Sequence, residues 1–252
     1  MLIDTHSHIY YEKYNDDLNE VIDRAKENGV EKIICVGTDL KSSIRSLEIS
    51  NKYDNIYCSI GCHPHESSKT EKNYLNKLEE ISKEDKVVAI GETGLDYYYN
   101  YSDSKIQKTR FIEQIELANS LELPVIIHNR DSDDDLYEIL KKYNPKGVIH
   151  CFSSNIDYAI KILELNILIS FTGIITFKNS TLNSVIEQVH LSKIMVETDS
   201  PYLTPEPNRG KRNEPSYVYY IAKKISEIKN IPIEEVIKHT TKNALNLFHK
   251  IK

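Results

Sequence analysis

The chain has 252 residues, 40% hydrophobic and 28% charged, which is typical of a soluble globular protein. No stretch approaches the 18 or so apolar residues of a membrane span, and the start lacks the basic and apolar regions of an export signal, so we expect no membrane partner and a cytoplasmic location. The net charge of −6 is unlike the basic surface of proteins that bind long duplex DNA, but it is compatible with a nuclease whose bound cations supply the positive charge.

This length matches one α/β barrel, which typically needs about 250 residues. We therefore expect a single domain spanning residues 1–252, and we take a monomer as the expected state. The 4 cysteines contain no CxxC pair, and most lie in apolar runs, so we expect reduced thiols rather than disulfides or a zinc knuckle.

Short apolar, β-branched runs recur along the chain with helical segments between them, as in βαβ units around a parallel sheet. Each run is nearly continuous in apolar residues, which is expected of strands buried on both faces. The runs comprise residues 2–4, 32–36, 56–60, 87–90, 125–127, 147–149, 167–171 and 194–196.

Between the runs the hydrophobic period becomes helical. Phe111, Ile115, Ala118 and Leu121 place one apolar stripe on a helix of about four turns. After the eighth run we expect one helix around residues 217–228 and a closing helix from Ile233 to Phe248. The segment 201–215 is too long for a simple turn and is predicted to be a functional loop.

Eight parallel strands can form either a closed barrel or an open doubly wound sheet. An open sheet would be expected to carry a glycine-rich phosphate loop after its first strand. The sequence instead has His-Ser-His there. We therefore predict a (β/α)8 TIM barrel with an extra C-terminal helix.

Histidines and carboxylates follow five of the eight runs. His6 and His8 occupy alternate positions, so both imidazoles leave the strand on the same side and can reach one ion. The other four candidates are Glu92, His128, His150 and Asp199. Each one alone has an ordinary explanation, as a hydrogen-bonded core histidine or as a carboxylate in a turn or helix cap. Together they predict a metal site, because the carboxyl ends of barrel strands share one rim.

The residue types also indicate which metals fit. Imidazole and carboxylate ligands suit Zn²⁺, Mn²⁺ or Fe²⁺ and accept Mg²⁺ where the substrate supplies further oxygens. Six ligands exceed the three that hold one open catalytic ion. We therefore predict two divalent ions, with a carboxylate such as Glu92 bridging them at about 4 Å separation.

A series of motifs runs almost from end to end of the chain: IDTHSH from residue 3, GCHPH from 61, IGETGLDYYY from 90, IIHNRD from 126, IHCFSS from 149, SFTGIITF from 170, VETDSPYLTP from 196 and RGKRNEP from 209. In these motifs and in their order the sequence resembles the TatD-type metal-dependent deoxyribonucleases of the amidohydrolase-like barrels. The chain departs from the family pattern at Ser132, where alanine is frequent, and at Ser154, where glycine is frequent.

The resemblance implies hydrolysis of DNA phosphodiester bonds, with family members described as exonucleases that work from the 3′ end; we expect a single-stranded substrate or one with free ends. It implies a first ion held by His6, His8, Glu92 and Asp199. A second ion would share Glu92 and also use His128 and His150.

A metal lowers the pKa of bound water to about 7, which supplies hydroxide at neutral pH. Asp199 is the candidate to orient that water and accept its proton. His63 faces the same rim and would either hydrogen-bond a phosphate or order its loop. Arg130 would either contact a phosphate or pair with Asp131 or Asp133.

Two other sets of residues have open interpretations. Tyr97, Tyr98, Tyr99, Tyr101 and Tyr202 suit base stacking, but packing is the more frequent role of tyrosines in a chain with 17 of them. Arg209, Lys211 and Arg212 would contact a nucleic-acid backbone or be solvated.

Two alternative functions remain. A barrel hydrolase acting on a C–N or ester bond would have a similar site, but such enzymes often bridge their ions with a carbamylated lysine, and Glu92 stands at that strand instead. A non-catalytic metal-binding interaction protein is the second alternative, and it would be expected to lack a ligand.

Overall fold

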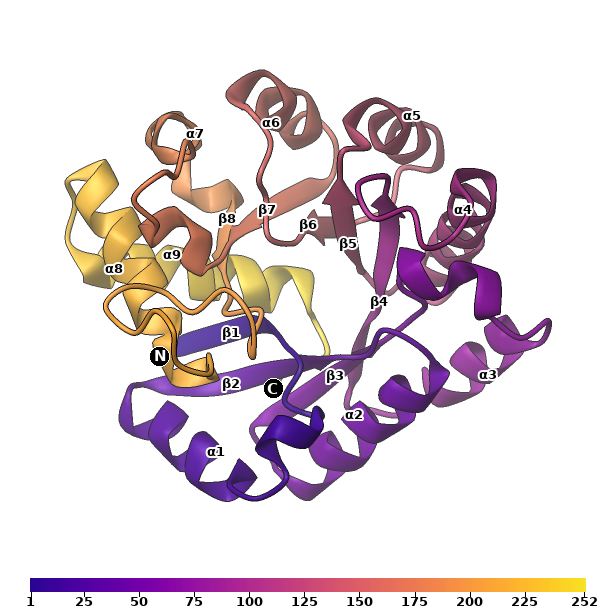
Figure 1. Cartoon of the computed structure of the whole chain (residues 1–252), viewed down its shortest axis with the longest axis horizontal. Coiled ribbons are helices and arrows are strands. Elements are labelled where there is room, and N and C mark those ends of the chain that lie inside the picture. The colour runs from indigo at the N-terminus through magenta and orange to yellow at the C-terminus, as the bar shows by residue number, and fades with distance from the viewer.

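The computed structural model describes all 252 residues and contains one sheet of eight strands in the order β1 to β8. Each neighbouring pair is parallel, and the sheet curves into a ring with the helices outside it (Figure 1). This confirms the predicted (β/α)8 barrel. The strands are β1 Leu2–Ser7, β2 Val30–Val36, β3 Ile56–Ile60, β4 Val87–Asp96, β5 Val125–Arg130, β6 Gly147–Ile149, β7 Ile167–Phe171 and β8 Ile194–Val196.

The ring closes between β1 and β8 through a short set of contacts. Ser7 bridges Ser200 in parallel, and the Thr5 hydroxyl donates to the Val196 carbonyl at 3.1 Å. The Asp199 amide donates to the His6 carbonyl at 2.9 Å. Two predicted metal ligands are therefore part of the seam that closes the barrel.

Nine α-helices cover or close the sheet. They are α1 Leu18–Glu27, α2 Leu40–Lys52, α3 Tyr74–Ile81, α4 Ser104–Ser120, α5 Asp133–Tyr143, α6 Ile156–Leu163, α7 Asn183–Gln188, α8 Val218–Lys229 and α9 Ile233–Leu247. Phe111, Ile115 and Ala118 of α4 are buried, as the predicted stripe requires. Local sequence fixes the starts of others: Asp39 and Ser42 form a capping box at α2, which satisfies two otherwise unpaired amides.

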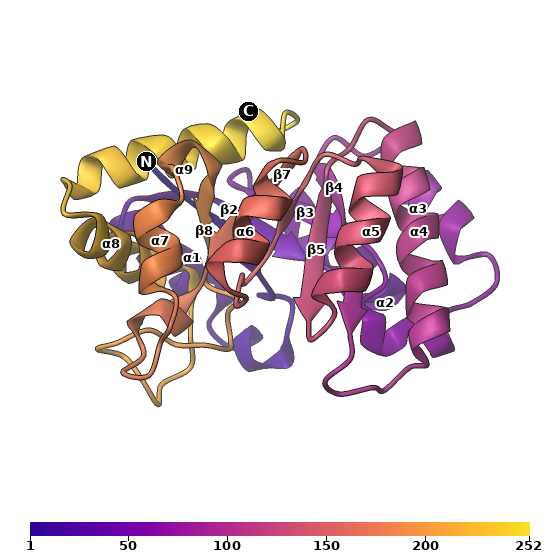
Figure 2. The ribbon, with the colours of Figure 1, turned by 90° about the horizontal axis from the view of Figure 1, so that it is seen from above.

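The apolar core has two layers. The larger layer lies between the sheet and the surrounding helices, and the smaller one fills the barrel. In the smaller layer, strand residues such as Ile34 and Ile126 pack with Phe248 and Ile251 of the C-terminal segment. Figure 2 shows α9 lying across the end of the barrel where the strands begin. The extra helix therefore closes the amino-terminal mouth and leaves the opposite rim for a site.

Three strands extend beyond their predicted ends, because polar residues at the rim continue the ladder that the apolar runs begin. β4 is the clearest case: Gly94 pairs with His128, and Asp96 pairs with Arg130. Glu92 therefore lies within β4 rather than at its end. The segment from residue 201 to 214 contains no helix or strand, as predicted, and all four cysteines are free. None of the helices has both the length and the hydropathy that a membrane span requires.

Candidate metal centre

Glu92 lies at the centre of the carboxyl-terminal mouth because two glycines let β4 approach β5 closely. Gly91 and Gly94 have φ of +147° and +143°, a region that residues with a Cβ rarely adopt. A Cβ on Gly94 would lie 2.0 Å from the His128 carbonyl oxygen, and one on Gly91 would lie 2.6 Å from that of Ile126. The glycines flanking Glu92 therefore serve backbone packing, and the packing brings this carboxylate beside His128.

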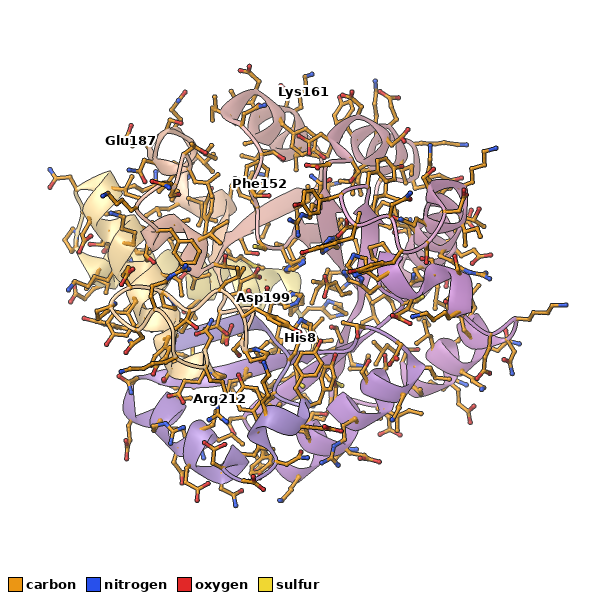
Figure 3. All side chains as sticks on the ribbon, viewed as in Figure 1. His8, Phe152, Lys161, Glu187, Asp199 and Arg212 are labelled. Atoms are coloured by element: carbon orange, nitrogen blue, oxygen red, sulfur yellow. The ribbon has the colours of Figure 1, made fainter.

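One oxygen of Glu92 faces the two histidines of β1. Oε2 lies 3.4 Å from His6 Nε2 and 3.7 Å from His8 Nε2. The two Nε2 atoms are 3.2 Å apart, and Asp199 Oδ1 is 3.7 Å from the first and 3.3 Å from the second. Figure 3 shows His8 and Asp199 side by side near the middle of the barrel mouth. These four side chains enclose one point, the first subsite.

The other oxygen of Glu92 faces a second group of imidazoles. Oε1 lies 2.9 Å from His128 Nδ1, 2.9 Å from His150 Nε2 and 3.2 Å from His63 Nε2. His128 Nδ1 and His150 Nε2 are 3.3 Å apart. These nitrogens enclose the second subsite, so the two oxygens of a single carboxylate serve two separate donor sets.

The far nitrogens of His8 and His128 are hydrogen-bonded to oxygens outside the two subsites, whereas that of His6 has no hydrogen-bond partner. His8 Nδ1 is 2.8 Å from the Val36 carbonyl oxygen, and His128 Nε2 is 3.0 Å from Asp96 Oδ2. His150 Nδ1 lies 3.3 Å from Glu197 Oε1, without the alignment of a hydrogen bond. An oxygen at the far nitrogen keeps the proton there, so the near nitrogen directs a lone pair into the subsite, which is the tautomer of a metal ligand.

His63 has the opposite tautomer. Its Nδ1 accepts a hydrogen bond from the His65 backbone amide at 3.1 Å, so the proton of the neutral ring sits on Nε2 and points at Glu92 Oε1. Burial lowers the pKa of His63 to about 4. His63 is therefore a neutral hydrogen-bond donor at the second subsite and not one of its lone-pair donors, and it also orders its own loop.

Charges in the site are strongly coupled. Burial acts to raise the pKa of Glu92, but the imidazoles of His150 and His63 hold it well below its usual range. Burial acts to lower the pKa of His150, but Glu92 and Glu197 hold it well above its usual range. The metal-free site thus keeps its carboxylates ionised and balances them with protons on imidazoles, which marks where a cation would bind.

The donor spacing fits a divalent ion. Ligand atoms 2.0 to 2.1 Å from a tetrahedral zinc are about 3.3 Å from each other. The separations in the first subsite run from 3.2 Å between His6 and His8 to 3.7 Å at Glu92 and Asp199. The side chain of Asp199 is 14% exposed whereas that of His6 is 0% exposed, so the first subsite is open to the cavity on its Asp199 side.

All six predicted ligand residues converge on this one mouth. They line or underlie a cavity of about 740 Å³, whose wall also contains His63 and Arg130. Arg130 forms no ion pair with Asp131 or Asp133; its guanidinium lies over the rings of Tyr98 and Tyr99, 3.9 and 4.7 Å from their centroids. No lysine lines this cavity, so no residue suited to a carbamylated bridge is present.

The arginines of the predicted basic cluster in the loop after β8 contact other side chains of the protein. Arg212 bonds both oxygens of Asp17 and lies over the Tyr14 ring. The guanidinium of Arg209 lies over Phe177, 3.7 Å from the ring centroid. These residues hold the loop against the barrel rather than forming a free cationic surface.

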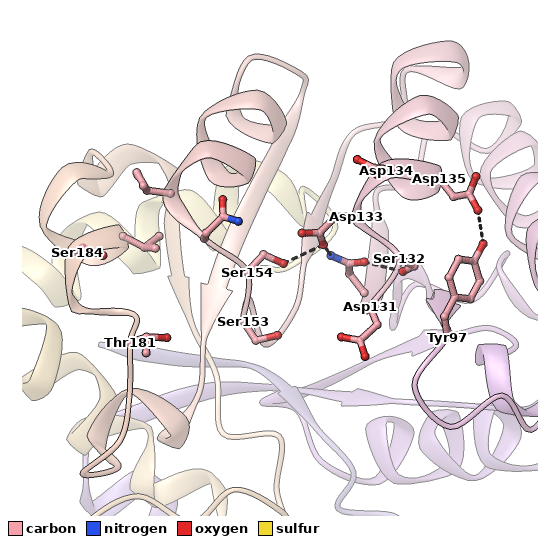
Figure 4. Close-up of a pocket in the computed structure, with 14 residues that line it drawn as sticks. Tyr97, Asp131, Ser132, Asp133, Asp134, Asp135, Ser153, Ser154, Thr181 and Ser184 are labelled. Atoms are coloured by element: carbon pink, nitrogen blue, oxygen red, sulfur yellow. Dashed lines mark hydrogen bonds between the residues drawn. The ribbon is translucent and has the colours of Figure 1, made fainter.

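A second cavity of about 870 Å³ adjoins the first and shares Asn129 and Ser153 with it. Figure 4 shows its carboxylates at the start of α5. Asp133 accepts hydrogen bonds from Asn129 and Ser154, and Asp135 pairs with Lys108 and accepts from Tyr97. We call this cavity the acidic pocket; it contains no imidazole.

Three imidazole or carboxylate side chains of the site were not assigned from the sequence: His65, Asp96 and Glu197. Asp96 lies between His65 and His128, at 2.8 and 3.0 Å from their Nε2 atoms. Glu197 is fully buried and accepts from the Cys151 amide and the Ser170 hydroxyl. Each lies within two to four residues of a predicted site residue, His63, Glu92 or Asp199, and this closeness was the available signal.

Comparison with known proteins gives a consistent result. Residues 3–249 match the family model described as TatD related DNase. A metal-dependent hydrolase of Bacillus subtilis is 44% identical over 98% of this chain and 99% of that protein. The deoxyribonuclease Tat-D of Schizosaccharomyces pombe is 31% identical over 96% of this chain and 91% of that protein. The crystal structure of a TatD homologue from Escherichia coli superposes with a TM-score of 0.94 at 30% identity, covering 98% of both chains.

Proposed function

The chain belongs to the family of TatD-related DNases and is a metal-dependent hydrolase, and from this premise we propose that it cleaves phosphodiester bonds of DNA, removing nucleotides from the 3′ end of single strands. The motif resemblance supports the polarity. The substrate class is supported by the family model and by the deoxyribonuclease named among the relatives.

One observation carries the proposal of two ions. The two oxygens of Glu92 face two different sets of imidazole nitrogens, each 2.9 to 3.7 Å away. A carboxylate between two donor sets is the arrangement of two-metal sites in phosphoryl transfer. His6, His8, Glu92 and Asp199 would hold one ion, and Glu92, His128 and His150 would hold the other. Divalent ions bound there would lower the pKa of an attacking water and offset negative charge on the phosphate.

The protein's own residues supply the remaining roles. Asp199 is the most exposed ligand of the first subsite, so it is placed to orient a water and accept its proton. The Nε2–H of His63 is directed into the site and would donate to a phosphate or leaving oxygen. The guanidinium of Arg130 has no carboxylate partner, so its N–H groups are free to bind a phosphate.

The depth of the site supports single-stranded or free-ended substrates. The side chains of His6 and Glu92 are 0% and 4% exposed, so a phosphate must enter the cavity to meet them. A flexible strand or a chain end can bend into the cavity, whereas the stiff backbone of an intact duplex cannot.

The test is a cleavage assay on chelator-stripped protein. Single strands labelled at the 5′ end would be incubated with Mg²⁺, Mn²⁺ or Zn²⁺, and the product ladder read over time. We expect a ladder that shortens one nucleotide at a time, only when a metal is present. A scatter of internal products would contradict the exonuclease mode alone.

The alternatives are tested in the same preparation. Hydrolysis of a cyclic amide or an ester in the presence of metal, with DNA left intact, would establish an amidohydrolase-type activity instead. Tight metal binding without hydrolysis of either substrate class would favour a non-catalytic metal-binding protein.

A further inference from the structure

Tyrosines line the candidate metal centre on two opposite sides. Tyr99 and Tyr101 follow β4, whereas Tyr202 follows β8 and Tyr11 follows β1, and all four line the same cavity. In a ring of eight strands ordered β1 to β8, β4 is across the barrel from β8 and β1. The ligands of the two subsites therefore lie between two aromatic walls.

The first wall consists of Tyr99 and Tyr101. Their rings are stacked, with centroids 5.4 Å apart and planes 10° apart. His65 meets both rings edge-on, at 5.5 and 4.8 Å, and Arg130 lies over Tyr99. The Tyr101 ring is held in orientation by these neighbours, yet the residue is 67% exposed. It therefore presents an uncovered ring at the cavity.

The second wall consists of Tyr11 and Tyr202. Their rings meet edge-to-face with centroids 5.9 Å apart, and Tyr11 also packs against the His8 ring at 5.6 Å. Tyr202 is 49% exposed. This wall is thus anchored to a first-subsite residue at one end and open to the cavity at the other.

We propose that the two walls are base-stacking subsites that hold one unpaired nucleobase on each side of the scissile phosphate. The inference rests on the proposed function and specifies how the site selects its substrate. A phosphodiester placed over Glu92 has a nucleoside on each side, and each nucleoside then meets one wall. A tyrosine ring can stack only on a base whose face is not covered by its neighbours in a duplex. The two walls would therefore select unpaired bases.

The walls suit bases rather than other apolar groups. Stacking on tyrosine accepts any base, which a degradative nuclease requires, and Arg130 beside Tyr99 adds a cation for the adjoining phosphate. Tyr101 and Tyr202 keep 67% and 49% of their surface exposed within the protein, so each retains ring surface on which a base can stack.

The experiment compares Tyr101→Ala and Tyr202→Ala with the wild type on two single strands. One is an oligothymidylate; the other is the same strand with base-free tetrahydrofuran residues on both sides of the 3′-terminal phosphodiester. Each alanine variant should raise KM for the oligothymidylate by about 5- to 100-fold with little change in kcat, because stacking binds substrate and transition state alike. On the base-free strand the variants should match the wild type.

Two controls separate stacking from other effects. Tyr101→Phe and Tyr202→Phe keep the ring and should stay within about twofold of the wild type. Tyr219→Ala removes an exposed tyrosine of α8 away from the cavity and should have no effect on either strand. The stacking proposal would be overturned if the alanine variants had the wild-type KM for the oligothymidylate, or if their KM rose equally on both strands. A wild type that cleaves neither strand with any metal would instead overturn the proposed function.

Discussion

The two adjoining cavities at the carboxyl-terminal mouth are both rich in carboxylates, but only one has the chemistry of a metal centre. In the acidic pocket, Asp133 and Asp135 bind side-chain amide, hydroxyl and ammonium groups at the start of α5, where the helix dipole also favours negative charge. In the cavity of the candidate metal centre, here called the metal cavity, Glu92 and Asp199 face the near nitrogens of imidazoles instead. The acidic pocket is the larger of the two. The partners of a carboxylate, and not the size of the cavity, therefore distinguish a reactive site from a capped helix end.

The two residues that depart from the family motifs sharpen this contrast. Ser132 and Ser154 both line the acidic pocket, where Ser132 donates to Asn129 and Ser154 donates to Asp133. The predicted ligands all belong to the metal cavity. The two positions at which the sequence departs from the family motifs that it resembles therefore lie in the acidic pocket, near Asp133, whose carboxylate already accepts two hydrogen bonds.

The largest expected effect distinguishes the carboxylates of the two cavities directly. Glu92→Gln removes the shared ligand of both subsites and should lower kcat/KM on a single-stranded oligonucleotide by more than about 10³-fold, with reduced bound metal by elemental analysis. Asp199→Asn should likewise abolish cleavage without unfolding the protein. Asp131→Asn, an equal change of charge in the acidic pocket, should leave both measurements within about twofold; a comparable loss there would erase the distinction.

Metal removal should show the same contrast in stability. A metal added at 100 times its Kd stabilises the folded state by about 2.7 kcal/mol, which corresponds to roughly 5 to 10 °C in Tm for a chain of this size. Calorimetry of stripped and reloaded protein measures the shift. Asp131→Asn should retain it and Glu92→Gln should lose most of it. An unchanged Tm in the wild type would speak against a bound ion.

A smaller effect is expected from the carboxylates that orient the imidazoles. Asp96→Asn and Glu197→Gln should weaken metal binding by about 10- to 100-fold, because the first removes the hydrogen bond that fixes the His128 tautomer and the second removes a negative charge 3.3 Å from His150 Nδ1. Asp133→Asn is the matched control, since this carboxylate is also hydrogen-bonded but lies in the acidic pocket. Titration with a metal indicator gives the affinities; equal values for Asp96→Asn and the control would deny an orienting role.

The smallest effect is a release of protons when metal binds. Nearby carboxylates raise the pKa of His150 and His128, so the metal-free site holds protons that a cation displaces. Because the folded-state pKa is raised, the stability from these protons is complete below about pH 6.5 and is lost as pH rises through the folded-state values. Calorimetry at pH 7 in two buffers of different ionisation enthalpy should detect about one proton or more per protein. If Glu92→Gln releases as many protons as the wild type, the protons come from groups outside the candidate metal centre.

Much of the fold could be predicted from the sequence because buried parallel strands are continuous apolar runs, and each of the eight predicted runs lies within or matches a strand. The strand ends could not be predicted so well, since rim residues such as Thr93 and Asp96 are polar yet paired with β5. The position of α9 could not be predicted either, because an amphipathic stripe shows that one face of a helix is buried but does not show which surface it packs against.

The candidate ligands were predictable for a related reason: a histidine or carboxylate directly after an apolar run lies at the rim. Glu197 also follows an apolar run directly, but its position beside His150 and that of Asp96 beside His128 depend on side-chain packing that the sequence does not show. The same limit applies to Tyr99 and Tyr101, since only the structure shows that they line the cavity.

The position of α9 has a consequence for turnover. Because Phe248 and Ile251 pack inside the barrel and α9 lies across its amino-terminal end, substrate and product would both pass through the carboxyl-terminal mouth. A released product would then compete with incoming substrate for this mouth. Product release would therefore limit the turnover rate as well as bond cleavage.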